Sequence, residues 1–298
     1  MKRMIPLLAL LLLMLLPAGC SEQKTYDIVA TTAPVQQFAQ AVCDGTGLEV
    51  GLVVSDSVAC LHDYTLSVHQ MAAVERAKLI LLSGVGLEAF LEDALTEASA
   101  RIDCSADARL ICYEDHEDHE HHEDHEHRGH DHGEYDPHIW LDPDNAAAMT
   151  RTLARELALY YPQHAERFAE NAEAYCQRLS QLKADGQALL EALSCRRLIT
   201  FHDGFAYFAD AFSLEIAASI EEDSGSEASA KDLRHISELV EAEQIPAVFV
   251  ERNGSRSAAS VIAAETGCAV AVLDTVMSGE DYITAMEENL HAILEALS

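Results

Sequence analysis

The stretch RLITFH at residues 197–202 decides the class of fold, because it is apolar or β-branched from Leu198 to Phe201 and ends on a polar residue. Such a continuous run is typical of a strand buried on both faces, as in parallel sheets covered by helices. Three similar runs follow: LEIAASI at 214–220, PAVFVE at 246–251 and CAVAVLD at 268–274. Helix-like segments lie between and after them, so this part of the chain is predicted to be an α/β lobe.

The same alternation occurs earlier in the chain. Strand-like runs are YDIVATT at 26–32, LEVGLVV at 48–54 and KLILLSG at 78–84, with helix-like segments around 34–44 and 67–77. We therefore expect an α/β fold of two lobes, each a mainly parallel sheet flanked by helices and each with its own core. The predicted N-terminal lobe spans 26–143 and the C-terminal lobe 195–298.

A helical connector, 144–194, is predicted between the lobes. Its helical pattern is broken once, at Tyr161-Pro162, and the second part, 163–193, has apolar residues at three- to four-residue spacing. A helix of about 30 residues is about 45 Å long. A long rigid helix of this kind would restrict hinge motion between the lobes.

The N-terminus has the pattern of an export signal. Lys2 and Arg3 precede an apolar run at 4–16, and LLPAGC ends at Cys20. We expect residues 1–19 to be removed and Cys20 to carry a lipid, with 20–25 as a spacer, although Pro17 replaces the usual leucine and simple secretion is the alternative. These features predict an extracytoplasmic protein anchored to the bacterial cell membrane or periplasmic.

The charge balance points to a cation as ligand. The formal net charge is -32 at pH 7, which makes nucleic acid and anionic lipid surfaces poor partners. Besides Cys20 the chain has seven cysteines without a CxxC pair, which argues against a thiolate zinc knuckle. Some could form disulfides, for example Cys104 with Cys112, or all could be small core residues.

Four metal-ligand residues occupy the same topological position. His62, His138, His202 and Asp274 each follow or end an apolar strand or lie in a short adjoining loop. Because ligands gather at the carboxyl ends of parallel strands, we expect these side chains to converge between the lobes. Three imidazoles and one carboxylate suit tetrahedral Zn²⁺, whereas Mn²⁺ prefers more oxygen ligands. The remaining histidines outside the His-rich segment are expected on the surface: His69, His164, His235 and His291.

Several motifs together resemble a known family. These are HDY at 62–64, DPHIWLDP at 136–143, FHDGFAYFA at 201–209 and VLDT at 272–275, with an acidic His-rich insertion before the second. They resemble the ZnuA-like zinc-binding solute receptors of ABC importers, within the metal-binding receptor family. The resemblance implies a monomeric receptor, without enzymatic activity, that binds Zn²⁺ through His62, His138, His202 and Asp274 and delivers it to an ABC permease.

The resemblance also bears on the choice of metal and on one loop. The manganese branch of the family usually has glutamate where this chain has His202, so zinc is favoured over manganese or another divalent metal. The family loop before the first histidine commonly contains glycine and proline, whereas this chain has Ala59-Cys60-Leu61. Some zinc receptors of the family have a glutamate beside this histidine. The residue here is Leu61, which cannot bind metal, so Asp274 becomes more necessary as the fourth ligand. Asp142 and Asp203 are assigned to capping or orienting roles.

The His-rich segment is predicted to work separately from the four ligands. Residues 114–134 contain eight histidines among alternating acids and too little apolar surface to fold, so we expect a disordered loop. Flexible ligands lose entropy on binding, which predicts weak capture or sensing of zinc, with a solvated linker as the alternative. Two rival functions are a zinc hydrolase, for which no HExxH motif is present, and a zinc-storing or adhesive surface protein.

Overall fold

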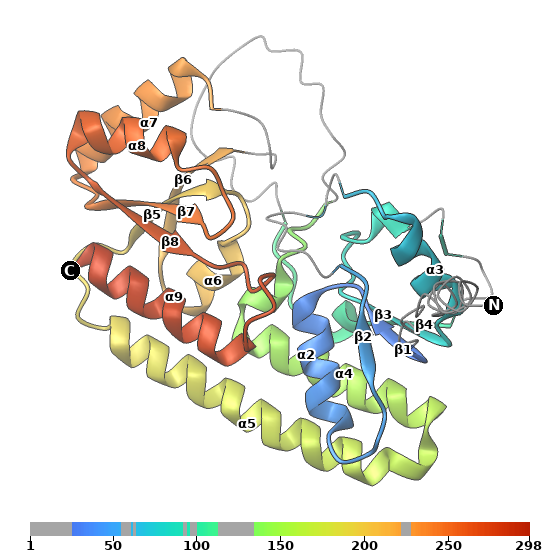
Figure 1. The fold of residues 1–298 in the computed structure, drawn as a ribbon. Coiled ribbons are helices and arrows are strands. Elements are labelled where there is room, and N and C mark those ends of the chain that lie inside the picture. The colour runs from blue at the N-terminus through green and yellow to red at the C-terminus, as the bar shows by residue number, and fades with distance from the viewer. Residues whose placement is uncertain are drawn as a thin grey trace, which may run out of the picture.

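Two parallel sheets with helices packed against them form the protein (Figure 1). The computed structural model describes residues 26–54, 61, 64–91, 94–95, 100–112, 134–221 and 228–298. The export signal, Cys20, His62 and the His-rich segment up to residue 133 lie outside the described residues. The predicted α/β fold with two lobes is confirmed.

The sheet of the N-terminal lobe has the strand order β2-β1-β3-β4. Its strands are β1 (Ile28–Ala30), β2 (Val50–Leu52), β3 (Leu79–Leu82) and β4 (Arg101–Asp103), all parallel. Helices α2 (Ala33–Cys43) and α3 (Val68–Arg76) follow β1 and β2. Strand β4 was not predicted, because only its central residue, Ile102, is buried and it has no apolar run.

The sheet of the C-terminal lobe has the order β6-β5-β7-β8. All four predicted strands are present: β5 (Arg197–His202), β6 (Glu215–Glu221), β7 (Ala247–Glu251) and β8 (Ala269–Leu273). The helices are α6 (Ala206–Ala211), α7 (Ala230–Glu243), α8 (Ser257–Thr266) and α9 (Tyr282–Leu297). All the strand pairs are parallel, so the carboxyl ends of β5 and β7 lie at one edge of the sheet.

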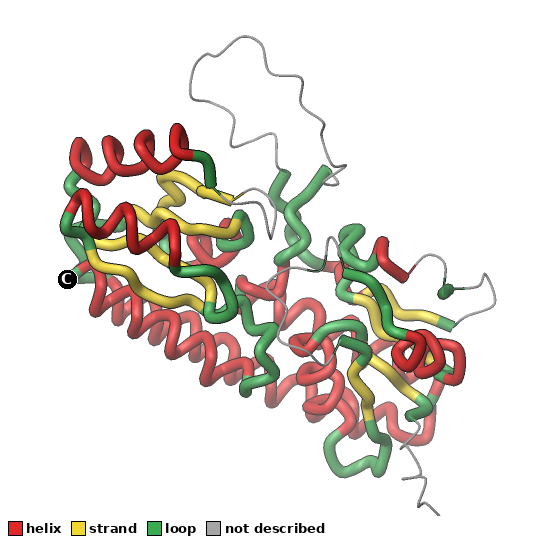
Figure 2. The backbone as a smooth tube through the Cα atoms, turned by 45° about the horizontal axis from the view of Figure 1, so that its top comes forward, coloured by secondary structure: helices red, strands yellow, loops and turns green. Residues whose placement is uncertain are grey.

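The connector consists of α4 (Pro143–Tyr160) and α5 (Ala165–Leu190), separated by a 3₁₀ turn at Pro162–His164. The break therefore falls at Tyr161-Pro162, as predicted. Helix α5 has 26 residues, which makes it about 39 Å long. It runs along one side of both lobes (Figure 2) and contacts α2 and α4 at one end and α9 at the other.

The expectation of a separate core for each lobe is wrong. The larger buried cluster is continuous from β1 and α2 through α4 and α5 to α9. Phe38 of α2 and Tyr282 of α9, for example, meet edge to face with ring centroids 5.0 Å apart. A smaller cluster lies only in the C-terminal lobe, between its sheet and α7 and α8. One continuous core therefore joins the two lobes.

The cysteines in the described part of the chain are all free thiols, including Cys104 and Cys112, which were named as an example of a pair, so the alternative of small core residues holds for them. Burial raises the pKa of Cys43 to about 12 and that of Cys104 well above its ordinary value, which keeps both thiols protonated. Across the described ranges, no helix combines the length and apolar character needed to cross a bilayer.

Gly186 allows α5 to pack closely on the C-terminal lobe. A Cβ at this position would lie 2.6 Å from Phe212 and 2.7 Å from Leu290. We expect Gly186→Ala to lower stability by about 1–3 kcal/mol through overpacking, although alanine is the better helix former. The midpoint of thermal unfolding, followed by circular dichroism, measures this effect.

The exposed Ala184 on the same helix provides the control. Ala184→Gly reports helix propensity alone and should cost about 1 kcal/mol or less. A Gly186→Ala protein that unfolds at a higher temperature than the unmodified chain would contradict the close packing.

Candidate metal centre

His138 and His202 meet where the two lobes touch. His138 precedes the 3₁₀ turn Ile139–Leu141 of the N-terminal lobe, and His202 is the last residue of β5. Their Nε2 atoms are 3.1 Å apart and the rings are inclined at 85°. Two nitrogens bound to one tetrahedral Zn²⁺ at about 2.0–2.1 Å would be about 3.3–3.4 Å apart. The pair is therefore close to the spacing that a shared zinc ion requires.

Asp136 fixes the orientation of the His138 ring. Its Oδ1 accepts hydrogen bonds from Nδ1 of His138 at 2.7 Å and from the backbone N–H of His138 at 2.8 Å. With the proton on Nδ1, Nε2 presents its lone pair toward His202. Carboxylates commonly orient metal-binding histidines in this way. The sequence analysis missed Asp136, although it lies two residues before His138 in the DPH motif.

The acidic surroundings also act on the charge state of His138. Burial alone would lower the pKa of its imidazole, but the Asp136 carboxylate, together with Glu251 and Asp203, raises the pKa above its ordinary value. The same negative potential attracts a cation to this position.

Contacts from the C-terminal lobe hold the loop that carries His138. The Tyr207 hydroxyl donates to the carbonyl oxygen of Asp136 at 2.9 Å and accepts from the backbone N–H of Ile111 at 2.9 Å. Burial raises the pKa of Tyr207 to about 12, so it remains a donor. On the other side of His138, the Trp140 indole donates to the carbonyl oxygen of Thr275 at 2.8 Å.

Gly204 lies directly against both imidazoles. A Cβ there would be 2.7 Å from Cδ2 and 2.8 Å from Nε2 of His202, and 3.0 Å from Cε1 of His138. The glycine of the FHDGF motif therefore provides the space in which the two rings approach each other.

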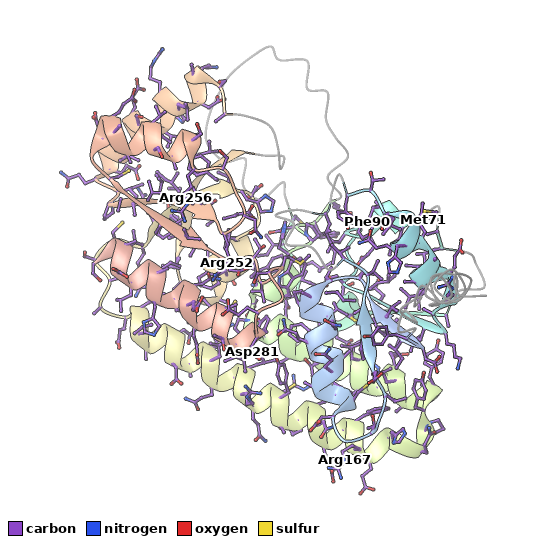
Figure 3. The ribbon with its side chains drawn as sticks, viewed as in Figure 1. Met71, Phe90, Arg167, Arg252, Arg256 and Asp281 are labelled. Atoms are coloured by element: carbon purple, nitrogen blue, oxygen red, sulfur yellow. The ribbon has the colours of Figure 1, made fainter. Side chains whose placement is uncertain are left out.

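Asp274 is buried after β8, and both of its carboxylate oxygens have other partners. Oδ2 is 2.7 Å from Nε of Arg252, and Oδ1 accepts from the backbone N–H of Val276 at 2.7 Å. Arg252 also contacts Glu280 and Glu288, at 3.5 and 2.7 Å. Figure 3 shows Arg252 on the side of the C-terminal lobe nearer the N-terminal lobe. The structure thus places Asp274 in an ion pair with Arg252.

Glu251 is a second carboxylate that the sequence analysis missed. It ends β7, it is buried with an exposed fraction of 7%, and its Oε1 is 3.9 Å from Nε2 of His202. The signal was present in the sequence, since PAVFVE ends on a glutamate at the carboxyl end of a strand.

The assigned supporting acids have identifiable roles. Asp142 caps α4 by accepting from the backbone N–H of Asp144, as predicted, and it also pairs with Lys183 of α5 at 3.0 Å. Asp203 accepts a hydrogen bond from the Ser219 hydroxyl at 3.3 Å.

The predicted ligand set is only partly described. His138 and His202 form a close pair, Asp274 is bound by Arg252, and His62 lies outside the described residues. Of the side chains that the structure describes, no group of three or more His, Cys, Asp or Glu is already assembled to hold a metal ion. Of the four histidines predicted on the surface, His69, His235 and His291 are exposed. The fourth, His164, is half-buried against Phe168.

The model of one protein family, ZnuA, the periplasmic component A of a zinc-uptake complex, matches residues 28–296. The chain belongs to the ZnuA family. The zinc-binding lipoprotein AdcA of Streptococcus pneumoniae (strain ATCC BAA-255 / R6) is 31% identical over 309 residues, which cover 98% of this chain but 60% of AdcA. The present chain therefore matches little more than half of that relative.

Solved structures of ZnuA-type proteins share the fold. A crystal structure of ZnuA has a TM-score of 0.79 at 26% identity and covers 92% of this chain and 100% of its own. The Zn(II)-bound ZnuA-like domain of Streptococcus pneumoniae AdcA has a TM-score of 0.74 at 26% identity, with 92% and 99% coverage. The expected ZnuA-like receptor fold is confirmed.

The carboxylate of Asp136 is expected to be needed for tight metal binding by this ZnuA-family chain. Asp136→Asn removes the charge that orients and polarises His138, so affinity for Zn²⁺ should fall by about 10- to 100-fold. Competition with a chromogenic chelator measures the change.

Asp144→Asn is the matched control, because it removes the same charge from an exposed side chain that pairs with Lys183. Its zinc affinity should equal that of the unmodified chain. Equal affinities for both variants would show that Asp136 does not act on the metal.

Proposed function

We propose that this protein is an extracytoplasmic receptor that captures Zn²⁺ between its two lobes and delivers it to the permease of an ABC importer. The observation that carries the proposal is the contact between Nε2 of His138 and Nε2 of His202, which come from different lobes and are 3.1 Å apart. Membership of the ZnuA family and the zinc-bound relative support the same metal. The protein acts as a receptor and performs no reaction.

The proposed ligands are His62, His138, His202 and Asp274. Three neutral imidazoles and a carboxylate would give a closed tetrahedral shell, which suits Zn²⁺ and leaves no position for a catalytic water. Asp274 would join this shell by exchanging its ion pair with Arg252 for the metal. The dense negative charge around the pair favours a doubly charged cation over a neutral solute.

Capture of the ion is proposed to change the lobes only slightly. Trp140 of the N-terminal lobe bonds to Thr275, and its own carbonyl oxygen accepts from the Tyr282 hydroxyl at 2.7 Å. These bonds, the shared core and α5 would all have to be disrupted by wide opening. Loop shifts around the ion would therefore give the permease its signal.

The proposed placement in the cell follows from the N-terminus. Cleavage after residue 19 would leave a lipid on Cys20, and the monomeric receptor would be tethered to the membrane through the spacer 20–25. The proposed lobes are 26–143 and 195–298, with 144–194 as connector.

Loss of either described histidine should abolish tight zinc binding. His138→Ala and His202→Ala each remove a direct ligand, so each should cost more affinity than the about 10- to 100-fold typical of an outer partner. Isothermal titration of zinc against a chelator gives the affinity and the stoichiometry.

His235→Ala, which changes an exposed histidine of α7, should leave the tight site intact. Several weak sites without a tight one in the unmodified chain would favour storage or adhesion. Ester or peptide hydrolysis that disappears in His202→Ala would favour a hydrolase. Either result would contradict the proposal that the protein is a zinc receptor.

We further propose that the His-rich segment collects zinc near the site. Backbone contacts connect the residues that flank it. Cys112 and Tyr135 form an isolated antiparallel β-bridge, and the backbone N–H of Asp136 donates to the carbonyl oxygen of Ile111 at 3.0 Å. The segment therefore leaves and re-enters the fold beside the residue that orients His138.

Deleting 114–134 tests this division of labour. The tight site should keep its affinity and its stoichiometry of one, while the additional weaker binding disappears, as measured by the same titration. Loss of the tight site on deletion would refute the proposal.

A further inference from the structure

Arg252 and Asp274 are neighbours because of the register of two strands. In the β7–β8 pair Glu251 is opposite Leu273, and the backbone N–H of Arg252 donates to the carbonyl oxygen of Leu273 at 2.9 Å. The next residue of the chain after Leu273 is Asp274, whose Oδ2 lies 2.7 Å from Nε of Arg252. The sheet therefore fixes this ion pair at the carboxyl end of both strands.

The two carboxylate oxygens of Asp274 are held differently. Asn289 bonds to the backbone N–H and the carbonyl oxygen of Asp274 at 2.7 Å each, and Oδ1 accepts from the backbone N–H of Val276 at 2.7 Å. Oδ2 is buried and, among the residues that the structure describes, accepts no well-directed hydrogen bond, although Nε of Arg252 is close. A buried carboxylate needs a cation beside it, and here the charge of Arg252 meets that need.

The position of Asp274 connects this ion pair with the histidine pair. The residue after Asp274 is Thr275, whose carbonyl oxygen accepts from the indole of Trp140 at 2.8 Å. Trp140 is two residues after His138, and their rings meet edge to face with centroids 5.5 Å apart. Arg252 thus places a positive charge beside a proposed zinc ligand, where it opposes the binding of a second cation.

Arg252 has other partners, which are farther from the site. Its Nη2 is 2.7 Å from Glu288 of α9 and 3.5 Å from Glu280, and its side chain is 41% exposed. The backbone at Glu280 is held from the other lobe, because the side chain of Gln37 on α2 donates to the carbonyl oxygen of Glu280 at 2.6 Å. The guanidinium can therefore give up Asp274 and stay paired with two acids outside the site.

We propose that Arg252 is the counter-ion of the empty site, which pairs with Asp274 when zinc is absent and lowers the affinity for Zn²⁺ by competing for this carboxylate. The inference rests on the proposed function, since it takes Asp274 as a zinc ligand. An interaction that stabilises the empty receptor more than the loaded one weakens ligand binding by the same free energy. Arg252 therefore favours release of the ion to the permease.

Arg252→Gln in the full mature chain tests this role. Zinc affinity is measured by chelator competition, and stability without metal by thermal unfolding. Removal of the competing charge should raise zinc affinity about 3- to 10-fold, within the range of coupling between contacting residues. The unfolding midpoint of the metal-free protein should fall, because the buried carboxylate loses its cation. An arginine with a purely structural role would not raise the affinity.

The same substitution in an Asp274→Asn background shows whether the arginine acts through that carboxylate. Asp274→Asn alone should weaken zinc binding. Adding Arg252→Gln to it should change the affinity by no more than about twofold, because the competition is already absent. Arg252→Lys restores a cation and should bring the affinity back below that of Arg252→Gln.

Arg256→Gln is the matched control. It removes the same charge from an exposed arginine that precedes α8 in the same lobe (Figure 3). Its zinc affinity should stay within about twofold of the unmodified chain, because solvent and salt screen an exposed charge.

The results separate this inference from the proposed function. If Arg252→Gln binds zinc no more tightly than Arg256→Gln, the inference is overturned. An equal rise in the Asp274→Asn background overturns it as well, because the arginine would then act on the ion without Asp274. An Asp274→Asn protein with unchanged affinity has the same consequence. If the unmodified chain has no tight zinc site, the receptor proposal itself fails.

Discussion

Two imidazoles that are buried at the contact between the lobes impose the strictest constraint on this structure. Removing their ring nitrogens from water costs free energy unless the nitrogens find partners, and here the Nε2 atoms face each other at 3.1 Å. Asp136 fixes one ring and Gly204 leaves room for both. Because each lobe supplies one ring, the spacing of the pair depends directly on how the lobes are seated against each other.

The rest of the fold maintains that seating. The larger core is continuous through both lobes, α5 lies along both, and Tyr207, Trp140 and Tyr282 form hydrogen bonds across the boundary. A shift of one lobe would break apolar contacts and buried hydrogen bonds together, so the cost would be far above that of a free hinge. The long helix alone, which the sequence indicates, gives only part of this rigidity.

The fold was predictable where one residue run determines one element. RLITFH predicts β5 with His202 at its end, and Tyr161-Pro162 predicts the break before α5. Strand β4 was not predicted because Ile102 is its only buried residue. The shared core was not predicted because side-chain contacts between helices that are distant in the sequence leave no periodic pattern in it.

The site was predictable to a lesser degree. Topological position identifies His138 and His202 as neighbours, and the same rule applied to PAVFVE would have included Glu251. The position of an acidic residue at the end of a strand does not determine whether its carboxylate points toward the metal site or toward another partner. For Asp274 the answer depends on Arg252, which lies on another strand end and meets it only through the register of β7 with β8.

The isolated β-bridge between Cys112 and Tyr135 determines how the fold responds to insertions and deletions between these two residues. This β-bridge and the bond from the backbone N–H of Asp136 to the carbonyl oxygen of Ile111 hold the two flanking positions together. The position of Tyr135 and of the residues after it therefore depends on contacts between described residues, and a change in the number of residues between Cys112 and Tyr135 leaves those contacts available.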